Sequence, residues 1–363
     1  MRVAFPKMSQ PFFSIIIPCW NVEPYVRECL ESVLRQPFGD WEIWVGVEES
    51  EDRTEEIVRE IAATDRRIHM FTGPRSGSAS CSRNIGMERA SGEYVIFLDG
   101  DDLLDEDCLS RLHQKIMEHP QADLYPCAMH FMGDTCRKDV EENYPIGGMG
   151  ELTGVEATIM LGEYRVSPNP QVPLTIFRRE FLRRHHLKFI PGIRNEEVDF
   201  SPKALYLAQK VVPLHEPYYW YRQRPHSVLS SERMGEIVPG AYHPFFAMTL
   251  RSLGEFFRKV SQEPDFDARC GKVWARHWTL ILFIRWFSKK YVTQIPRAER
   301  LATLSMLFGD GFSDYDALMR YANFTRRFAF LWVKVFVRFP SLRWLAERFF
   351  VGCYFPWTNA KRK

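Results

Sequence analysis

The sequence predicts an α/β fold, with a mostly parallel sheet covered by helices on both faces and a helical C-terminal region. Short apolar runs alternate with helical patterns over the first hundred residues, an order typical of parallel sheets. Beyond residue 230 the strand alternation is lost and the pattern is helical. The chain has 363 residues, 45% of them hydrophobic, which is enough for a sizeable core and for two or three domains.

The first strand is expected at 14–17 and ends at Pro18. A helix follows, because apolar residues from Val22 to Leu34 recur at helical spacing. Later elements are expected in the same alternation, with strands at 42–47, 68–71 and 94–98 and helices at 54–63 and 78–90. The segment from 123 to 221 mixes strands and helices.

Carboxylates are concentrated where these strands end. Open parallel sheets bind their ligands beyond the carboxyl ends of the strands. The residues at those ends are Pro18, 48–52 and 99–102, and two of these three positions are rich in acids. Folding does not require acids there, so the pattern indicates a binding site.

The most informative motif is Phe97-Leu-Asp-Gly-Asp-Asp102, in which a buried strand ends in three acids within four residues. Grouped carboxylates repel one another unless a cation or solvent compensates. Divalent ions such as Mg²⁺ or Mn²⁺ take oxygen ligands and often bridge protein to phosphates. The alternative is a polar turn that caps the next helix near Asp105.

Over about residues 11–230 the chain resembles the inverting glycosyltransferases of family 2, which have the GT-A fold. The resemblance depends on four stretches in the family's order and spacing: Ser14-Ile-Ile-Ile-Pro-Cys-Trp-Asn21, Ser80-Cys-Ser-Arg-Asn-Ile-Gly86, Phe97-Leu-Asp-Gly-Asp-Asp102 and Asn195-Glu-Glu-Val-Asp-Phe200. It implies a catalytic domain at 1–230, with a nucleotide-sugar half at about 11–125 and an acceptor half at about 126–230. Residues 231–363 form a helical C-terminal region.

The resemblance also implies an activity. A sugar moves, with inversion, from a nucleotide diphosphate sugar to a hydroxyl of a saccharide or lipid-linked acceptor, with Mn²⁺ or Mg²⁺ as cofactor. UDP is the commoner donor carrier in the family. The setting implied is the biosynthesis of a polysaccharide or lipopolysaccharide.

The family's metal and nucleotide residues fall on several positions of this chain. Asp101 holds the metal on the donor diphosphate, Asp99 contacts the ribose or the metal, and Pro18 belongs to the same nucleotide site. Arg83 lies beside the nucleotide, unless it only forms a surface salt bridge. Glu48 replaces the aspartate that reads the donor base, so the base identity is open; the alternative is a solvated acidic loop.

An inverting transfer needs a carboxylate that takes the acceptor's proton. The family's base is the second acid of a pair at the start of a helix, and here that position is Glu197, after Glu196. Acids at a helix N-terminus also stabilise its dipole without any catalytic role. Glu196 is the other candidate for the base.

Other functions fit the sequence less well. A noncatalytic nucleotide-sugar-binding protein on the same fold is the main alternative, because Glu48 and Glu197 both replace aspartate. A phosphatase of the haloacid dehalogenase type is disfavoured by Leu103, where that chemistry needs Thr or Val. A nucleotidyltransferase would have a glycine-rich loop after the first strand, but Pro18-Cys-Trp-Asn21 contains no glycine. The eight cysteines are scattered, which disfavours zinc and disulfide frameworks.

The C-terminal tail is strongly basic. Residues 320–363 contain ten basic side chains and one acid, Glu347, although the whole chain carries a net charge of only +2. An acidic body with a basic tail is not typical of nucleic-acid binding. Neither a signal peptide nor a spanning run of about 18 apolar residues is present, so we expect a cytoplasmic protein.

The tail suggests peripheral contact with the inner face of the cell membrane. Arg327, Lys334 and Arg338 are spaced so that one stripe of a helix is basic, and aromatic and aliphatic residues cover the rest of 328–339. A second apolar segment, with Trp344, Leu345, Phe349 and Phe350, follows Pro340. The alternative is that these helices pack on the protein or form a dimer interface.

Overall fold

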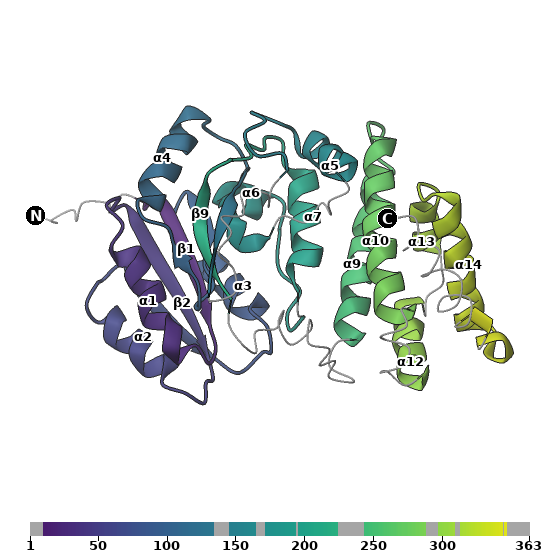
Figure 1. The fold of residues 1–363 in the computed structure, drawn as a ribbon, viewed down its shortest axis with the longest axis horizontal. Coiled ribbons are helices and arrows are strands. Elements are labelled where there is room, and N and C mark those ends of the chain that lie inside the picture. Colours follow the sequence, from purple (N-terminus) through teal and green to yellow (C-terminus); the bar gives the residue numbers. More distant parts are fainter. Residues whose placement is uncertain are drawn as a thin grey trace, which may run out of the picture. The chain divides into compact units, whose positions relative to one another are not determined.

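The computed structural model describes residues 10–133, 145–164, 171–193, 195–223, 243–287, 297–308, 313–343 and 345–346. The chain forms two compact units (Figure 1). The first comprises 1–157 and 169–224, and the second comprises 158–168 and 225–363, so the division falls within helix α5 (Gly154–Glu163). The domain boundary expected at 230 lies in the stretch 224–242, outside the described residues.

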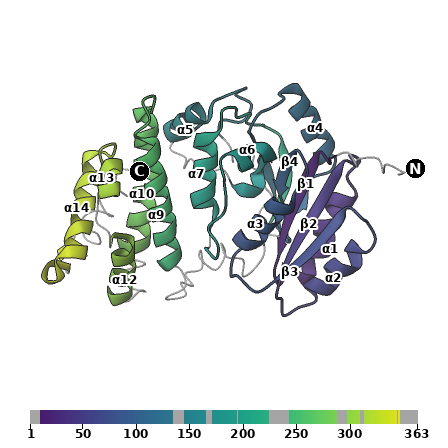
Figure 2. The ribbon, with the colours of Figure 1, turned by 180° about the vertical axis from the view of Figure 1, so that it is seen from behind.

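A six-stranded sheet forms the centre of the first unit, in the order β3-β2-β1-β4-β8-β6. The strands β1 to β4 run parallel to one another (Figure 2), and β8 is antiparallel to both β4 and β6. Their bounds are Phe13–Cys19 for β1, Trp41–Glu48 for β2, Ile68–Gly73 for β3, Tyr94–Phe97 for β4, Leu124–Pro126 for β6 and Thr175–Arg178 for β8. The expected mostly parallel sheet is confirmed.

Helices cover both faces of this sheet, because successive side chains of a strand point to opposite sides. Ile15 and Ile17 of β1 are buried in one cluster with residues of α1 (Glu23–Leu34), α2 (Thr54–Ala62) and α4 (Cys108–Glu118). Ile16 faces the other side, against α3 (Ser80–Arg89). A Cβ at Gly86 of α3 would lie 2.4 Å from Ile16 Cγ2, so only glycine permits this close approach.

A three-stranded sheet in the order β5-β9-β7 lies beyond the end of β4. Its strands are Leu103–Leu104 for β5, Ala128–Met132 for β7 and Pro217–Arg222 for β9. Leu103 pairs with Trp220, which brings β9 to the loop that follows β4. The first unit also contains η1 (Val172–Leu174), α6 (Arg179–Arg184) and α7 (Glu197–Leu207).

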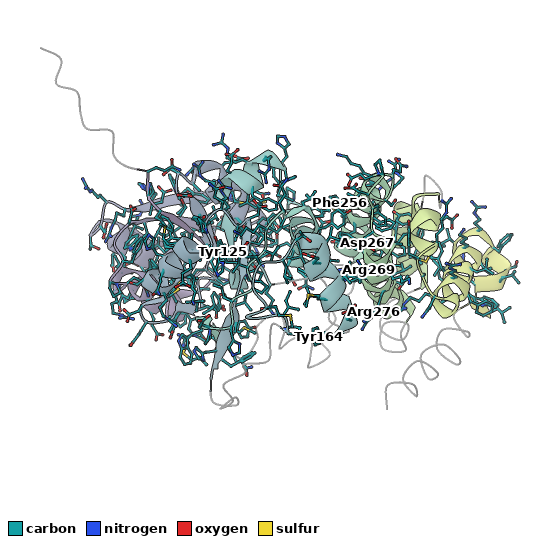
Figure 3. All side chains as sticks on the ribbon, turned by 90° about the horizontal axis from the view of Figure 1, so that it is seen from above. Tyr125, Tyr164, Phe256, Asp267, Arg269 and Arg276 are labelled. Atoms are coloured by element: carbon teal, nitrogen blue, oxygen red, sulfur yellow. The ribbon has the colours of Figure 1, made fainter. Side chains whose placement is uncertain are left out.

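The second unit is helical, as the sequence pattern predicts. Its helices are α9 (His243–Val260), α10 (Ala268–Phe287), α12 (Arg297–Phe308), α13 (Ser313–Met319), α14 (Phe324–Arg338) and η2 (Pro340–Leu342). Trp278 of α10 is buried in its core, with its ring centroid 5.0 Å from that of Tyr315 and 5.9 Å from that of Phe330. Arg276 donates to the carbonyl of Gly162 at 3.4 Å, so the end of α5 packs against α10 (Figure 3).

Helix α14 contains most of the expected basic and apolar segment 328–339. The second apolar segment falls mainly on Trp344 and on residues after 346, outside the part of the chain that the structure describes. Among the described helices, none has the length and apolar character needed to cross a bilayer.

Candidate active site

The carboxyl ends of β1 and β4 meet at one edge of the sheet. Ile16 pairs with Phe97, and the amide of Leu98 donates to the carbonyl of Ile16 at 3.1 Å. The backbone segments that follow β1 and β4 approach most closely at Gly100, where an added Cβ would lie 2.8 Å from Cys19 Sγ and 3.1 Å from the carbonyl oxygen of Pro18. Pro18 therefore lies directly against the loop 99–102, which we call the acidic loop.

Arg83 connects this loop to helix α7. It lies in the first turn of α3, is 4% exposed, and donates from Nη2 to Asp99 Oδ1 at 2.6 Å. Its Nη1 donates to Glu196, the residue that precedes α7. Burial disfavours the charge of Arg83, but the carboxylates of Asp99 and Glu196 outweigh burial and raise its pKa. This burial excludes a surface salt bridge.

Two buried donors of α3 are left without partners among the residues that the structure describes. They are the Nε of Arg83 and the hydroxyl of Ser80. Unpartnered buried polar groups are costly and therefore uncommon in folded proteins. Both lie in the first turn of a helix, and Arg83 lies beside the acidic loop, which is suitable for an anionic ligand such as a phosphate.

Glu48, at the end of β2, is 7% exposed and is therefore not part of a solvated loop. Its carboxylate accepts hydrogen bonds from the amide of Ser76 at 2.8 Å, from the Ser76 hydroxyl, and from the Ser82 hydroxyl at 3.5 Å. Glu48 thus holds the segment before α3 against the end of β2. No sequence pattern indicates this arrangement, because Ser76 is one of several polar residues in an irregular stretch.

The first residue of α7, Glu197, differs from its neighbour Glu196 in its surroundings. Glu196 forms the ion pair with Arg83. Burial, aided by the charge of Glu196, raises the pKa of Glu197 to about 7. A carboxyl group that changes charge near neutral pH is suited to accept a proton at that pH. The two acids therefore lie in different electrostatic surroundings.

Asp102 is the most deeply buried acid of the loop, at 1% exposed. It accepts hydrogen bonds from the hydroxyl of Tyr219 and from the amide of Arg222 at 2.7 Å. Burial, together with the charges of Asp101 and Asp99, raises the pKa of Asp102 to about 8. Asp102 is therefore mostly protonated at neutral pH, and Asp99 and Asp101 are the acids of the loop that lie partly exposed.

Comparisons with known proteins agree with this geometry. Residues 14–185 match the sequence profile of Glycosyl transferase family 2. These residues thus resemble a glycosyltransferase family 2 domain. The chain is similar to EpsJ of Bacillus subtilis, an uncharacterised glycosyltransferase, at 33% identity over 220 residues, which cover 60% of this chain and 63% of EpsJ. It is also 34% identical over 124 residues to TuaG of the same species, a putative teichuronic acid biosynthesis glycosyltransferase, covering 34% of this chain and 47% of TuaG. The matched parts thus span less than two thirds of both relatives.

Among solved structures, residues 1–349 of TarS from S. aureus, in complex with UDP, have a similar fold. The TM-score is 0.65 at 20% identity, and the match covers 89% of this chain and 87% of that one. The GT-A fold implied by the resemblance is confirmed. The family 2 match runs from β1 to α6 and contains Pro18, Glu48, Arg83 and the acidic loop, whereas Glu197 and β9 follow it in the sequence.

The acidic loop offers a suitable place for a divalent cation. The charges of Asp99 and Asp101 both raise the pKa of Asp102, so a cation between them would relieve their repulsion. Within the described ranges, no three His, Cys, Asp or Glu side chains form a group that could hold a metal. A Mg²⁺-like ion held by one or two carboxylates and by substrate phosphates needs no such group.

The structure brings together five of the expected residues: Pro18, Arg83, Asp99, Asp101 and, through Glu196, Glu197. Glu48 belongs to the neighbouring strand end and is bound to Ser76 and Ser82. Sequence reasoning assigned no role to Tyr219. The signal that could have found it is a tyrosine in a strand that ends in a basic residue, Arg222.

Proposed function

We propose that this protein transfers a sugar from a nucleotide diphosphate sugar, with UDP as the carrier, to a hydroxyl of a saccharide or lipid-linked acceptor. The transfer inverts the anomeric carbon and serves the biosynthesis of a polysaccharide or lipopolysaccharide. The observation that carries this proposal is the buried Arg83, which joins Asp99 of the acidic loop to Glu196 beside Glu197. The similarity to TuaG, named for teichuronic acid biosynthesis, and to TarS, solved with UDP, supports the substrate class.

The acidic loop and Arg83 serve the donor. Asp101 and Asp99 would hold Mn²⁺ or Mg²⁺, which when bound neutralises the charge that develops on the departing diphosphate. Arg83 adds a fixed positive charge beside this loop, and its Nε is available for a phosphate oxygen. Pro18 and Glu48 border the donor site at the ends of β1 and β2.

Glu197 serves the acceptor. Its carboxylate takes the proton of the acceptor hydroxyl while that oxygen attacks the anomeric carbon from the side opposite the diphosphate. Glu196 is a positioning residue, because its ion pair with Arg83 fixes the start of α7 beside the acidic loop. A base with a pKa of about 7 is largely ionised above neutral pH and still basic enough to accept a proton.

Turnover of a panel of nucleotide sugars, with Mn²⁺ or Mg²⁺ and with a chelator, tests the proposal. Glu197→Gln should lower turnover by about 10²–10⁴-fold and largely keep donor binding, because only the proton acceptor is lost. Glu49→Gln is the matched control, since Glu49 is exposed and should tolerate the change. Binding of nucleotide without turnover of any donor would favour the noncatalytic alternative.

We also propose that the protein contacts the inner face of the cell membrane through α14. This helix has two apolar faces. One face consists of Phe330, Val333 and Phe336 and is buried within the second unit. The other includes Phe328 and Leu331, whose side chains are 43% and 54% exposed. The exposed face continues to Phe339 and Leu342, which are 51% and 41% exposed.

Basic residues lie near this exposed face in the sequence. From 320 to 346 the chain has six basic side chains and no acid. Lys334 forms an ion pair with Asp316 at 2.6 Å, and Arg327 donates to the carbonyl of Ala322 at 2.8 Å, so part of the expected basic stripe is bound within the unit. Arg338 is exposed. An apolar face bordered by positive charge is suited to the headgroup region of an anionic bilayer.

Sedimentation with anionic and with neutral vesicles tests the membrane proposal. The double variant Phe328→Ser/Leu331→Ser should lose most of the binding to anionic vesicles, because both side chains are already exposed and their removal spares the core. Met117→Ser is the control, since Met117 is an equally exposed apolar residue, at 60%, in the first unit. Equal binding by the double variant and the parent, or no binding by the parent at low salt, would contradict the proposal.

A further inference from the structure

One hydroxyl joins the two ends of the acidic loop. The loop closes on itself through a hydrogen bond of 2.9 Å from the amide of Asp102 to the carbonyl of Asp99. The amide of Asp99 donates to the hydroxyl of Tyr219 at 3.3 Å, and this hydroxyl in turn donates to Asp102 Oδ2. Tyr219 is 2% exposed, so solvent does not compete for either bond.

Arg222, on the same strand, holds the rest of the loop. Its amide donates to Asp102 Oδ1 at 2.7 Å, and its Nε donates to the carbonyl of Asp101 at 2.9 Å. Its Nη2 forms an ion pair with Glu28 of α1 at 2.6 Å. Strand β9 therefore contacts every residue of the acidic loop that has a side chain.

We propose that Tyr219 is a positioning residue that sets the affinity of Asp99 and Asp101 for the divalent cation. This inference rests on the proposed function, because it needs the acidic loop to hold that cation. Tyr219 acts through Asp99 and Asp102. Removal of its hydroxyl leaves two buried groups without their partner, the Asp99 amide and one oxygen of Asp102, and the loop must shift to compensate.

A small shift is enough to matter for a metal. Ligating groups must be held within about 0.5 Å of their productive positions. Residues that orient the ligands without touching the metal typically contribute 10–100-fold to metal affinity. The effect of Tyr219 should therefore appear in binding that depends on the cation and not in binding without it.

The neighbouring residue provides a matched control. The hydroxyl of Tyr218 is also buried, but it has no hydrogen-bond partner among the described residues. Tyr218 and Tyr219 point to opposite faces of β9, because they are adjacent in a strand. Tyr218→Phe therefore removes the same atom from the same strand without a contact to the acidic loop.

Calorimetry of UDP binding, with Mn²⁺ and with a chelator, tests the inference. The quantity of interest is the gain in UDP affinity that Mn²⁺ provides. We expect Tyr219→Phe to reduce this gain by about tenfold and to leave UDP affinity in the presence of chelator unchanged. Tyr218→Phe should change neither the gain nor the affinity with chelator. An unchanged gain in Tyr219→Phe overturns the inference, and so does an equal loss of UDP affinity under both conditions. If the parent protein shows no gain with Mn²⁺, the metal-dependent function and the inference fail together.

Thermal unfolding first establishes that each variant is folded. If Tyr219→Phe does not fold, Arg222→Gln takes its place, because it removes the bond to the Asp101 carbonyl. Glu28→Gln is the control for this variant, since it weakens the ion pair to Arg222 but leaves that bond in place. The same selective loss of the Mn²⁺ gain is expected for Arg222→Gln and not for Glu28→Gln. No difference between these two variants overturns the inference.

Discussion

The ionisation of Glu197 should determine how the transfer rate depends on pH. Burial and the charge of Glu196 raise the pKa of this carboxyl from 4.5 to about 7. As a general base it acts only when deprotonated, so the rate should rise with pH. About a tenth of the base is ionised at pH 6 and about nine tenths at pH 8, which predicts a rise of roughly tenfold. A glutamate with an ordinary pKa would be ionised throughout this range, and the rate would stay flat.

A second variant identifies the group that causes the rise. The charge of Glu196 raises the pKa of Glu197, whereas Arg83 lowers it. Glu196→Gln removes the first influence and releases Arg83 from an ion pair, so the pKa of Glu197 should fall, by roughly one unit. The rising limb of the profile should move to lower pH by the same amount.

The assay is the turnover rate at saturating donor and Mn²⁺, measured between about pH 5.5 and 8.5 for both proteins. Asp102, with a pKa of about 8, also titrates in this range, but Asp101 and Asp99, not Glu196, are the charges that raise its pKa. A limb caused by Asp102 would therefore stay in place in Glu196→Gln. The assignment of Glu197 is refuted if the limb does not move, or if the parent profile is flat across this range.

Three further outcomes are expected. Asp101→Asn should abolish the gain in nucleotide affinity from Mn²⁺ while the thermal unfolding temperature is kept, and calorimetry with unchanged metal dependence would contradict this. Gly100→Ala should weaken the same gain, because the new Cβ would lie 2.8 Å from Cys19 Sγ, and Cys19→Ala should restore part of it. Val333→Ala should lower the free energy of unfolding by about 1–3 kcal/mol, because Val333 is fully buried, whereas Leu331→Ala should change it by less than about 0.5 kcal/mol in denaturant titrations.

The sequence was sufficient for the parts of the site that depend on local pattern. Each parallel strand is a short apolar run that ends in a change of composition, so its carboxyl end could be located within one or two residues. Asp99 and Asp101 follow directly from this pattern, as does the position of Arg83 at the start of a helix. The expected parallel strands and the GT-A fold are confirmed.

Other features depend on pairings that no local pattern encodes. Tyr219 reaches Asp102 from 117 residues along the chain, and the contact exists only because β9 pairs with the two residues of β5. Likewise, the bonds between Glu48 and Ser76 depend on the conformation of an irregular segment. Between residues 328 and 337 the apolar residues of α14 are interrupted in the sequence only by Lys334, and only packing within the second unit divides them into a buried and an exposed set.

The position of β9 late in the chain affects when the protein acquires its site during synthesis. Ribosomes synthesise the chain starting from its N-terminus, and compact segments begin to fold as they emerge from the ribosome. Strands β1 to β4 and helices α1 to α3 precede residue 98, whereas the residues that hold the acidic loop in place are Tyr219 and Arg222. A nascent chain that has exposed all of the acidic loop still lacks these two supports. We therefore expect cation-dependent binding of a nucleotide diphosphate to begin only when translation has passed β9, near the end of the first unit.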